Sequence, residues 1–481
     1  MSTETAVGRV PEGPTGRQII TFANVDAGTA RREARDVARL DLVDARDIGT
    51  FESLEEVDAD GVYFSALGIA VVDSAPEQLG SLSRAVGDST SPIIAVEPEV
   101  YVHAFDTFES TGAADGVETA DTAETGAVDE VDIAEVDTDD ADDDADVAET
   151  YVDTPTYTWG LKAVRAIPPI LHTAPWTGTG IRIAILDTGI DLGHPDFAGR
   201  VLASQSFIPG EPVHDGHSHG THCAGTAAGI KAPAGGRRYG VAHHSRLLVG
   251  KVLSNSGSGT SGQILAGIDW AIRSGAHVIS MSLGSRVNVG QPHYTYYEQA
   301  AVAALDAGSL IVAAAGNDGW SPVGAPANSP SVLAVAALDQ SLQRASFSCV
   351  ALNGGGGEIN VAAPGVATYS SVPVAKGSYG VKSGTSMATP HVAGVAARLA
   401  QKTGFRGRAL WREIERTAVP LPQSAQEVGK GLAVVPVRRM AVVAHPPTPW
   451  RPGPIIDPGS TDPGSTDPGS TDSGSTEPPT S

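Results

Sequence analysis

The stretch I-R-I-A-I-L-D-T-G-I, residues 181–190, joins a run of apolar residues to an aspartate and a glycine. Its apolar part predicts a strand buried on both faces, and Gly189 predicts a turn directly after Asp187. Five later runs have the same character and are separated by Ala/Gly-rich segments of helical length: 246–252, 277–281, 310–315, 332–336 and 359–362. Apolar strands alternating with helices are typical of a parallel sheet, so we predict a layered α/β domain over residues 154–440.

The charge of the chain is strongly uneven along its length. The 481 residues have a formal net charge of −24, and residues 106–150 hold eighteen Asp or Glu with neither Lys nor Arg. Because like charges at this density repel, we predict a disordered acidic linker over residues 106–153. A metal-binding acidic cluster is the alternative interpretation. The acidity argues against nucleic acid as a partner.

Residues 17–105 have the pattern of a small α+β unit. Strand patterns occur at 17–22, 63–72 and 92–102, and a weaker one lies between 40 and 60. Helix patterns occur at 28–40 and 75–86. The order β-α-β-β-α-β predicts a ferredoxin-like sheet. We expect residues 1–16 to form a flexible N-terminus and residues 441–481, with their D-P-G-S-T repeats, to form a Pro/Gly/Ser/Thr-rich disordered tail.

Two cysteines, Cys223 and Cys349, are too few for a disulfide framework, and we favour free thiols over a mutual disulfide. The first twenty residues lack a basic segment followed by an apolar one, so we expect no ordinary secretory signal. No apolar run reaches the length of a membrane span. Localisation therefore stays open between the cytoplasm and export by a non-standard route.

Three polar residues lie either at the carboxyl end of a predicted parallel strand, where reacting groups are found in such sheets, or at the start of a predicted helix. Asp187 closes the first apolar run, His219 begins H-G-T-H-C-A-G-T, and Ser386 lies in G-T-S-M-A-T-P-H-V-A-G, residues 384–394. A serine hydroxyl becomes a nucleophile when a base takes its proton, and the imidazolium so formed needs a fixed carboxylate. The pattern predicts Ser386 as nucleophile, His219 as general base and Asp187 as the orienting carboxylate.

The tetrahedral intermediate of such a reaction also needs hydrogen-bond donors. Asn317 follows the run at 310–315 on a turn, and Ser386 begins a helix whose Pro390 we place in the first turn. We therefore expect the side-chain amide of Asn317 and the backbone N–H of Ser386 to form an oxyanion hole.

Three rival interpretations are weaker. The histidines at 214, 217, 219 and 222 suggest a zinc cluster, but the H-E-x-x-H pattern is absent. Asp187-Thr188-Gly189 matches an aspartic-protease motif. That class of protease needs two copies of the motif, and the nearest second copy lies in the low-complexity tail. A scaffold that has lost its activity is the non-enzyme alternative, and an intact set of four catalytic residue types argues against it.

The segment from about Trp159 to Val437 resembles the subtilisin family of serine proteases, most of all the branch that includes proteinase K. The resemblance rests on the motifs around Asp187, His219 and Ser386, on A-A-G-N-D-G at Ala314, and on shorter matches that follow in family order. It implies a three-layer subtilisin-like domain with a mostly parallel central sheet. It also implies a serine endopeptidase in which Asp187, His219, Ser386 and Asn317 are catalytic.

The resemblance further implies how substrate is held. Two edge segments are expected to pair with an extended peptide, Gly257, Ser258 and Gly259 on one side and Ser282, Leu283 and Gly284 on the other. Four small residues are expected to form the walls of the primary specificity pocket: Ala314, Ala315, Gly316 and Gly324. Their size leaves room for a large apolar side chain before the cleaved bond.

Two more expectations come from the family. Asp196 matches a family calcium ligand, although the loop after the histidine helix lacks the family's Asn-rich ligands. No cofactor is needed for the chemistry, and structural calcium is a candidate only. Residues 17–105 fit an inhibitor-like propeptide that assists folding and blocks the cleft with residues 100–105, and self-cleavage is expected after that strand or in the linker.

Overall fold

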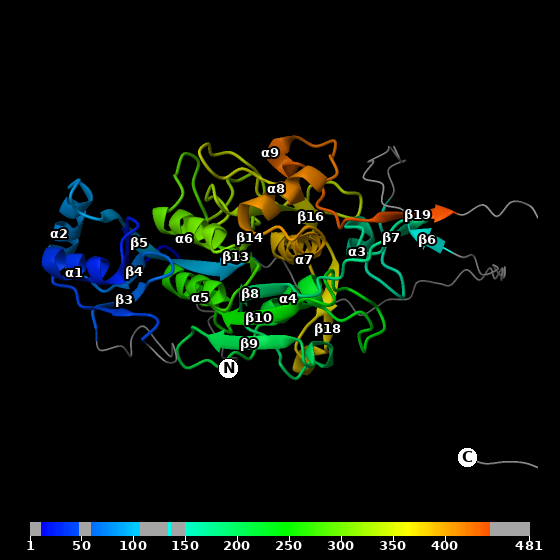
Figure 1. Cartoon of the computed structure of the whole chain (residues 1–481), viewed down its shortest axis with the longest axis horizontal. Helices are drawn as coiled ribbons and strands as arrows, with labels where there is room; N and C mark the ends of the chain where they lie inside the picture. The colour runs from blue at the N-terminus through cyan, green and yellow to red at the C-terminus, as the bar shows by residue number, and fades with distance from the viewer. Residues whose placement is uncertain (1–10, 48–58, 106–132, 136–149, 443–481) are drawn as a thin grey trace, which may run out of the picture.

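The computed structural model describes residues 11–47, 59–105, 133–135 and 150–442. Its central sheet has seven parallel strands in the order β16-β15-β14-β12-β8-β10-β9 (Figure 1). Their bounds are β8 Arg182–Asp187, β9 Val201–Ser206, β10 Arg246–Lys251, β12 Val278–Met281, β14 Leu310–Ala314, β15 Leu333–Leu338 and β16 Val361–Pro364. All six predicted runs lie in this sheet, so the parallel α/β prediction is confirmed. Strand β9 was not predicted, because it is an edge strand whose V-L-A-S-Q-S sequence lacks an apolar run.

Helices pack on this sheet in two groups. Helices α4 (His219–Ala228) and α7 (Thr385–Thr403) pack against each other, and α8 (Gly407–Thr417) packs on α7. Helices α5 (Ser261–Arg273) and α6 (Thr295–Asp306) form the second group. Small residues allow α4 to pack closely against the segment at 368–371, because a Cβ on Gly225 would lie 2.2 Å from the Ser371 hydroxyl.

Shorter elements complete this part of the chain. They are α3 Trp159–Ala163, β7 His172–Thr173, η1 Pro195–Phe197, β11 Ser258–Thr260, β13 Leu283–Gly284, β17 Thr368–Ser371, η2 Val374–Lys376, β18 Tyr379–Lys382, α9 Ala425–Val428 and β19 Arg438–Val442. Strands β17 and β18 form an antiparallel pair, and β19 pairs with both β7 and β6 (Ile133–Glu135). No helix within the described ranges is both long and apolar enough to cross a membrane.

The N-terminal unit has one strand more than predicted. Its elements are β1 Pro14–Phe22, α1 Ala27–Ala38, β2 Leu42–Asp44, β3 Gly61–Phe64, β4 Ile69–Val72, α2 Pro76–Val86 and β5 Ile93–Ala104. The predicted single strand at 63–72 is wrong: β3 and β4 pair as an antiparallel hairpin around the turn that includes Gly68. The sheet order is β5-β1-β4-β3-β2.

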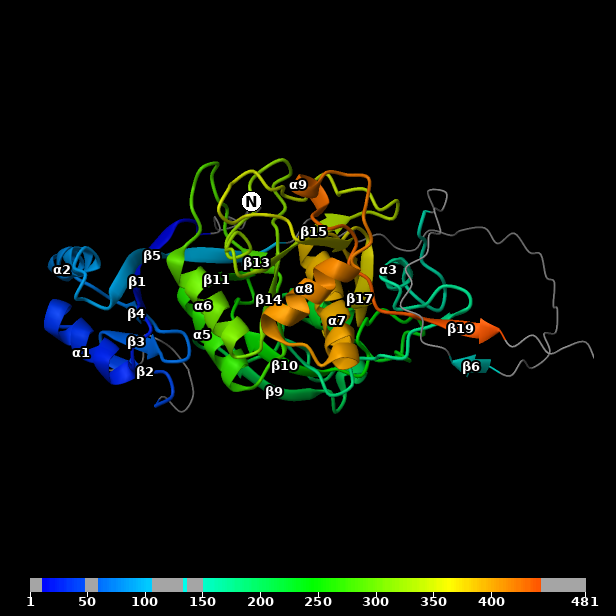
Figure 2. The same cartoon turned by 45° about the horizontal axis from the view of Figure 1, so that its top comes forward.

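The N-terminal sheet is buried on both faces. Helices α1 and α2 pack on one face around Ile20, Phe22 and Leu82, forming a small core of their own. The other face, with Ile19, Phe64 and Val71, joins the large core of the parallel-sheet domain. Figure 2 shows α5 and α6 beside this face of the sheet. Burial on both faces explains why β4 reads as a continuous apolar run.

Two carboxylates on β5 bind the helices beneath the sheet. Glu99 Oε1 accepts a hydrogen bond from the Gly262 amide at 3.1 Å, at the start of α5, and Glu97 Oε1 accepts one from the Thr295 amide at 3.0 Å, at the start of α6. A carboxylate satisfies the unpaired N–H groups of a helix start and interacts favourably with the helix dipole. The N-terminal unit is therefore docked by charge as well as by apolar contact.

The structure moves three segment boundaries. Strand β1 begins at Pro14, inside the segment expected to be flexible, and β19 ends at Val442, two residues into the expected tail. The predicted linker contains β6 and ends early, because the Tyr151 amide donates to the Gln340 carbonyl at 2.8 Å. The remaining linker residues, most of the tail and residues 1–10 lie outside the described ranges.

Candidate active site

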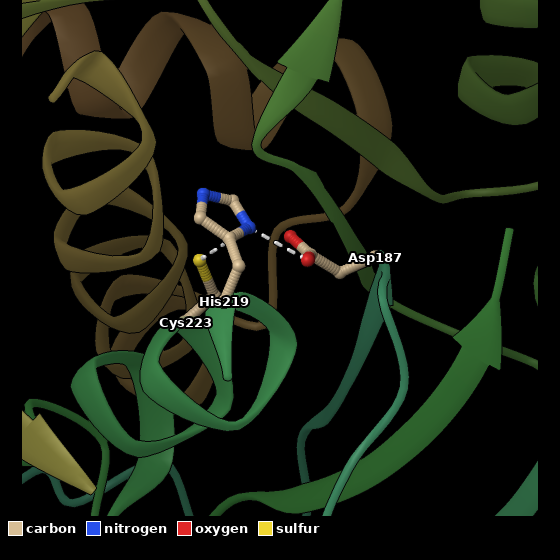
Figure 3. Close-up of side chains that lie close together, drawn as sticks. All are labelled: Asp187, His219 and Cys223. Atoms are coloured by element: carbon tan, nitrogen blue, oxygen red, sulfur yellow. Dashed lines mark hydrogen bonds and ion pairs between the residues drawn. The ribbon is translucent and has the colours of Figure 1, made fainter. Parts of the chain in front are cut away.

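Asp187 and His219 form a buried pair at the carboxyl end of β8, an inner strand of the parallel sheet (Figure 3). Asp187 is the last residue of β8, and His219 is the first residue of α4. His219 Nδ1 lies 2.7 Å from Asp187 Oδ1, and both side chains are fully buried. The carboxylate therefore fixes the orientation of the imidazole, with Nδ1 directed toward Asp187.

A second aspartate, which the sequence analysis missed, holds the turn before α4. Buried Asp215 accepts hydrogen bonds from the Ser218 and Thr221 amides at 2.8 Å and from the Thr188 hydroxyl at 2.8 Å. Thr188 Oγ1 in turn accepts from the Gly220 amide at 2.9 Å. This network connects the residue after Asp187 to the first turn of the histidine helix. An aspartate shortly before a helix start is a capping signal and could have identified it.

Ser386 is the second residue of α7 and faces Ser282. Its hydroxyl donates to the Ser282 carbonyl at 3.1 Å, and the Ser282 hydroxyl donates to the Ser386 carbonyl at 2.8 Å. Pro390, expected in the first turn, lies inside the helix. Because proline has no N–H, it leaves the Ser386 carbonyl without its usual partner four residues on, and the Ser282 hydroxyl takes that role.

Cys223 belongs to the histidine helix α4, and its side chain lies against the start of the serine helix α7. Its Sγ is 3.9 Å from His219 Nδ1 and 3.5 Å from the Ser386 carbonyl. Burial raises the pKa of the Cys223 thiol, which keeps the group protonated. Cys223 and Cys349 are both free and buried, so the prediction of free thiols is confirmed.

Asn317 directs its side-chain amide at the end of the N-terminal unit. Asn317 Oδ1 accepts hydrogen bonds from the Thr385 amide at 2.9 Å and hydroxyl at 2.8 Å. These contacts fix the side chain so that Nδ2 donates to the Phe105 carbonyl at 2.7 Å. The Phe105 carbonyl also lies near Gly384, where a Cβ would approach it to 2.8 Å. One carbonyl group is thus held between the asparagine and the start of α7.

Strand β5 continues out of the N-terminal sheet between two edge segments of the parallel-sheet domain. On one side His103 pairs with Ser258 and Val102 pairs with Gly259. On the other side Ala104 pairs with Leu283, and both pairings are antiparallel. Gly257 accepts a hydrogen bond from the Ala104 amide at 2.9 Å. The two segments identified from the sequence therefore hold an extended chain between them.

The Phe105 side chain lies at a cavity of about 310 Å³. Gly316 and Gly324 line this cavity, whereas Ala314 and Ala315 do not and instead lie buried at the end of β14 and just after it. A Cβ on Gly284 would lie 2.6 Å from the Phe105 ring. An ion pair of 2.6 Å between Arg286 and Asp318, both lining residues, was not anticipated.

Comparison with known proteins identifies the family. The model of the subtilase family matches residues 178–431, more than half of the chain. This chain belongs to the subtilase family. Subtilisin NAT from Bacillus subtilis subsp. natto is 43% identical over 281 residues, covering 57% of this chain and 69% of the relative. Subtilisin from Bacillus pumilus is 42% identical over 281 residues, covering 57% and 95%, and Subtilisin Savinase from Lederbergia lenta is 43% identical over 276 residues, covering 57% and 95%.

This subtilase is a subtilisin-like serine endopeptidase with a three-layer α/β domain. The zinc interpretation fails on geometry. Within the described residues, the group of three close ligand atoms is Asp187, His219 and Cys223, not the four histidines. His222 Nε2 instead contacts the Thr368 carbonyl at 3.0 Å.

Both carboxylate oxygens of Asp196, the candidate calcium ligand of this subtilase, already accept hydrogen bonds from the protein. Asp196 Oδ2 accepts from the Tyr239 and Tyr379 hydroxyls at 2.5 and 3.0 Å, and Oδ1 accepts from the Ala234 amide at 3.1 Å. Burial raises the pKa of Tyr379 to about 12, so the phenol keeps its proton. The guanidinium of Arg237 lies 5.1 Å from the Tyr369 ring, which stacks on Tyr379. These donors and this cation do not fit a calcium ion, which needs several free oxygen ligands.

Proposed function

We propose that this subtilase hydrolyses peptide bonds through an acyl-enzyme formed on Ser386. In this proposal His219 is the general base, Asp187 orients it, and Asn317 stabilises the oxyanion. The pair of 2.7 Å between His219 and Asp187 supports the assignment, as does the position of Cys223 against both His219 and the Ser386 carbonyl. These roles are the ones that the corresponding residues have in subtilisin.

The chemistry then follows from the groups present. The Ser386 hydroxyl gives its proton to His219 Nε2 as its oxygen attacks the peptide carbonyl, and Asp187 stabilises the resulting imidazolium. Negative charge on the carbonyl oxygen is stabilised by Asn317 Nδ2 and by the Ser386 amide at the start of α7. His219 returns the proton to the leaving amine, and water then releases the acyl group by the same steps in reverse.

We further propose that the chain is a zymogen that cuts its own Phe105–Asp106 bond. The observation that carries this proposal is the hydrogen bond of 2.7 Å from Asn317 Nδ2 to the Phe105 carbonyl, which lies where the oxyanion would form. The pairing of β5 with β11 and β13 supports it, because substrate peptides bind by strand addition. The N-terminal unit would then remain bound as an inhibitor after the cut.

Specificity for a large apolar residue before the cut is the corresponding substrate proposal. The Phe105 ring approaches Gly284 and Gly324, whose lack of side chains leaves it room. Substitution of either glycine by a larger residue would place atoms against the ring. The narrower resemblance to the proteinase K branch and the localisation stay predictions.

The proposal is tested by labelling the purified protein with a fluorophosphonate, which reacts with activated serines. We expect one labelled site, Ser386, and loss of both labelling and peptidase activity in Ser386→Ala. Cys223→Ser is a matched control because it replaces a neighbouring group of similar size and should leave labelling in place. Labelling of Ser386→Ala at another residue, with activity retained, would refute the assignment.

A further inference from the structure

Arg398 is a buried cation on the serine helix, about three turns after Ser386. Its side chain is 1% exposed. The Nε group donates to the Val241 carbonyl at 2.8 Å, and Nη2 lies 3.4 Å from His243 Nδ1. The remaining nitrogen, Nη1, is buried and has no hydrogen-bond acceptor among the described residues.

Arg238 approaches the same histidine from the loop after α4. Its Nη2 lies 3.0 Å from His243 Nδ1, and its Nε is buried without an acceptor in the described part of the chain. Since both guanidinium groups can only donate, His243 Nδ1 is the acceptor and the ring is neutral. Burial, followed by the charges of Arg238 and Arg398, lowers the pKa of His243 to about 2, in keeping with this arrangement.

The two arginines approach the same His243 nitrogen, and among the described residues no carboxylate forms an ion pair with either of them. Burial lowers the pKa of Arg398 to about 9 and that of Arg238 to about 10, so both carry a positive charge at neutral pH. No ion pair within the described ranges includes either residue. Asp153, on the adjacent segment, binds Arg237 at 3.0 Å and the Trp159 amide at 2.7 Å instead. Arg398 is buried and Arg238 is partly buried, and two like charges this close to one neutral ring are unfavourable unless a counter-charge accompanies them.

We propose that a small inorganic anion, such as chloride, binds to Arg238 and Arg398 beside His243. The anion accepts hydrogen bonds from Arg398 Nη1 and Arg238 Nε, which have no acceptor within the described ranges, and it offsets the charge of buried Arg398 and of partly buried Arg238. A water molecule could satisfy the same N–H groups but could not supply the negative charge. The ligand class is therefore a halide or a compact oxyanion, since arginine binds both through fixed N–H donors.

This site connects three parts of the peptidase domain. Arg398 belongs to α7, which carries Ser386, and its Nε holds the Val241 carbonyl of the loop after α4. The Arg238 backbone donates to the Thr156 carbonyl at 2.8 Å and accepts from the Thr158 amide at 3.0 Å. An anion bound here stabilises the attachment of the segment at 150–158 to the serine helix. It acts on stability and takes no part in the reaction.

The test measures thermal unfolding of the full chain with Ser386→Ala, which prevents self-digestion. Chloride is titrated against gluconate, a bulky anion, at constant ionic strength. We expect the unfolding midpoint to rise and saturate with chloride, by about 5 °C when chloride reaches roughly 100 times its Kd. Arg398→Met keeps the apolar volume of the side chain and removes the charge, and it should abolish the response. Arg246→Gln, which removes an exposed cation, should keep it.

A second measurement covers the case in which Arg398→Met does not fold. Crystals of the Ser386→Ala chain grown with bromide should show an anomalous peak between Arg238 and Arg398, and Arg238→Gln should lose both the peak and the chloride response. The proposal is overturned if the midpoint follows gluconate and chloride equally, or if the density beside both arginines is water alone.

Discussion

The side-chain amide of Asn317 donates a hydrogen bond of 2.7 Å to the main-chain carbonyl of Phe105. These residues are 212 positions apart, and they meet because β5 leaves its own sheet and pairs with β11 and β13. The Thr385 amide and hydroxyl bind the Asn317 carbonyl oxygen, so the asparagine cannot turn its amide away without losing two hydrogen bonds. The donor is thus fixed before any charge develops, which is the arrangement that favours catalysis.

Replacing Asn317 with Ala should reduce kcat by about 10²–10³-fold with little change in KM, because the lost hydrogen bond strengthens as the oxyanion forms. This magnitude is one measured in a subtilisin rather than calculated from the present geometry. Steady-state kinetics on a peptide substrate checks the prediction. A change confined to KM would show that Asn317 binds the ground state only.

Replacing Phe105 with Gly should slow self-cleavage by roughly 10-fold, because the partly buried Phe105 ring contributes at the lower end of the about 1.5–3 kcal/mol expected for full burial, and the variant loses this contact. Phe105→Leu is the matched control, since it keeps most of the apolar surface. The rate of disappearance of the full-length chain on a gel measures the effect. Equal rates for the two variants would mean that the pocket does not select the residue.

We predict that no calcium ion bound at Asp196 contributes to stability, because hydrogen-bond donors already satisfy this carboxylate. The unfolding midpoint of the Ser386→Ala chain should be the same in EDTA and in calcium chloride solutions of matched chloride content. A fall of the midpoint in EDTA would show that the chain binds a stabilising cation.

Within the same cluster, Tyr239→Phe should destabilise the fold by about 1–3 kcal/mol, because it removes a hydrogen-bond donor from a buried carboxylate. Tyr369→Phe is the control. The Tyr369 ring stacks on Tyr379, but among the described residues the hydroxyls that donate to Asp196 are those of Tyr239 and Tyr379, not that of Tyr369. Chemical denaturation of the two variants gives the comparison. Equal losses would remove Tyr239 from its assigned role.

The binding of the N-terminal unit should weaken as the pH falls below about 6.5. Burial against the peptidase domain lowers the pKa of His103 from its usual 6.5. A histidine with a lowered pKa in the complex stabilises that complex above its free pKa and loses this contribution as the pH falls through the lowered value. Dissociation of the cut N-terminal unit at different pH values measures the effect. His103→Gln should show a smaller pH dependence, and an unchanged one would contradict the prediction.

The fold was predictable where residue type reports burial. The six apolar runs became neighbouring parallel strands because strands covered on both faces must be apolar throughout. Strand β9, at the sheet edge, gave no such signal, and the hairpin at Gly68 was hidden because β3 and β4 are both buried. The pattern of apolar residues indicates which segments are buried, but it does not indicate where a continuous apolar run forms a turn.

Short motifs identified Asp187, His219 and Ser386 as candidates, and the structure places Asp187 against His219, while the catalytic roles of the three residues stay predictions. Residues that act through contacts distant in sequence were not found. Asp215 is one, because its role depends on Thr188 approaching the start of α4. The approach of Arg238 and Arg398 to the same His243 nitrogen is another, since 160 positions separate the two arginines and neither stands in a recognisable motif.

The masses of the fragments decide whether Ser386 cuts the bond after Phe105. The masses of the fragments from the purified wild-type chain and from Ser386→Ala are determined after expression under the same conditions. We expect an N-terminal fragment ending at Phe105 in the wild type and an uncut chain in the variant. A wild-type fragment ending elsewhere, or the same fragment in Ser386→Ala, would contradict it.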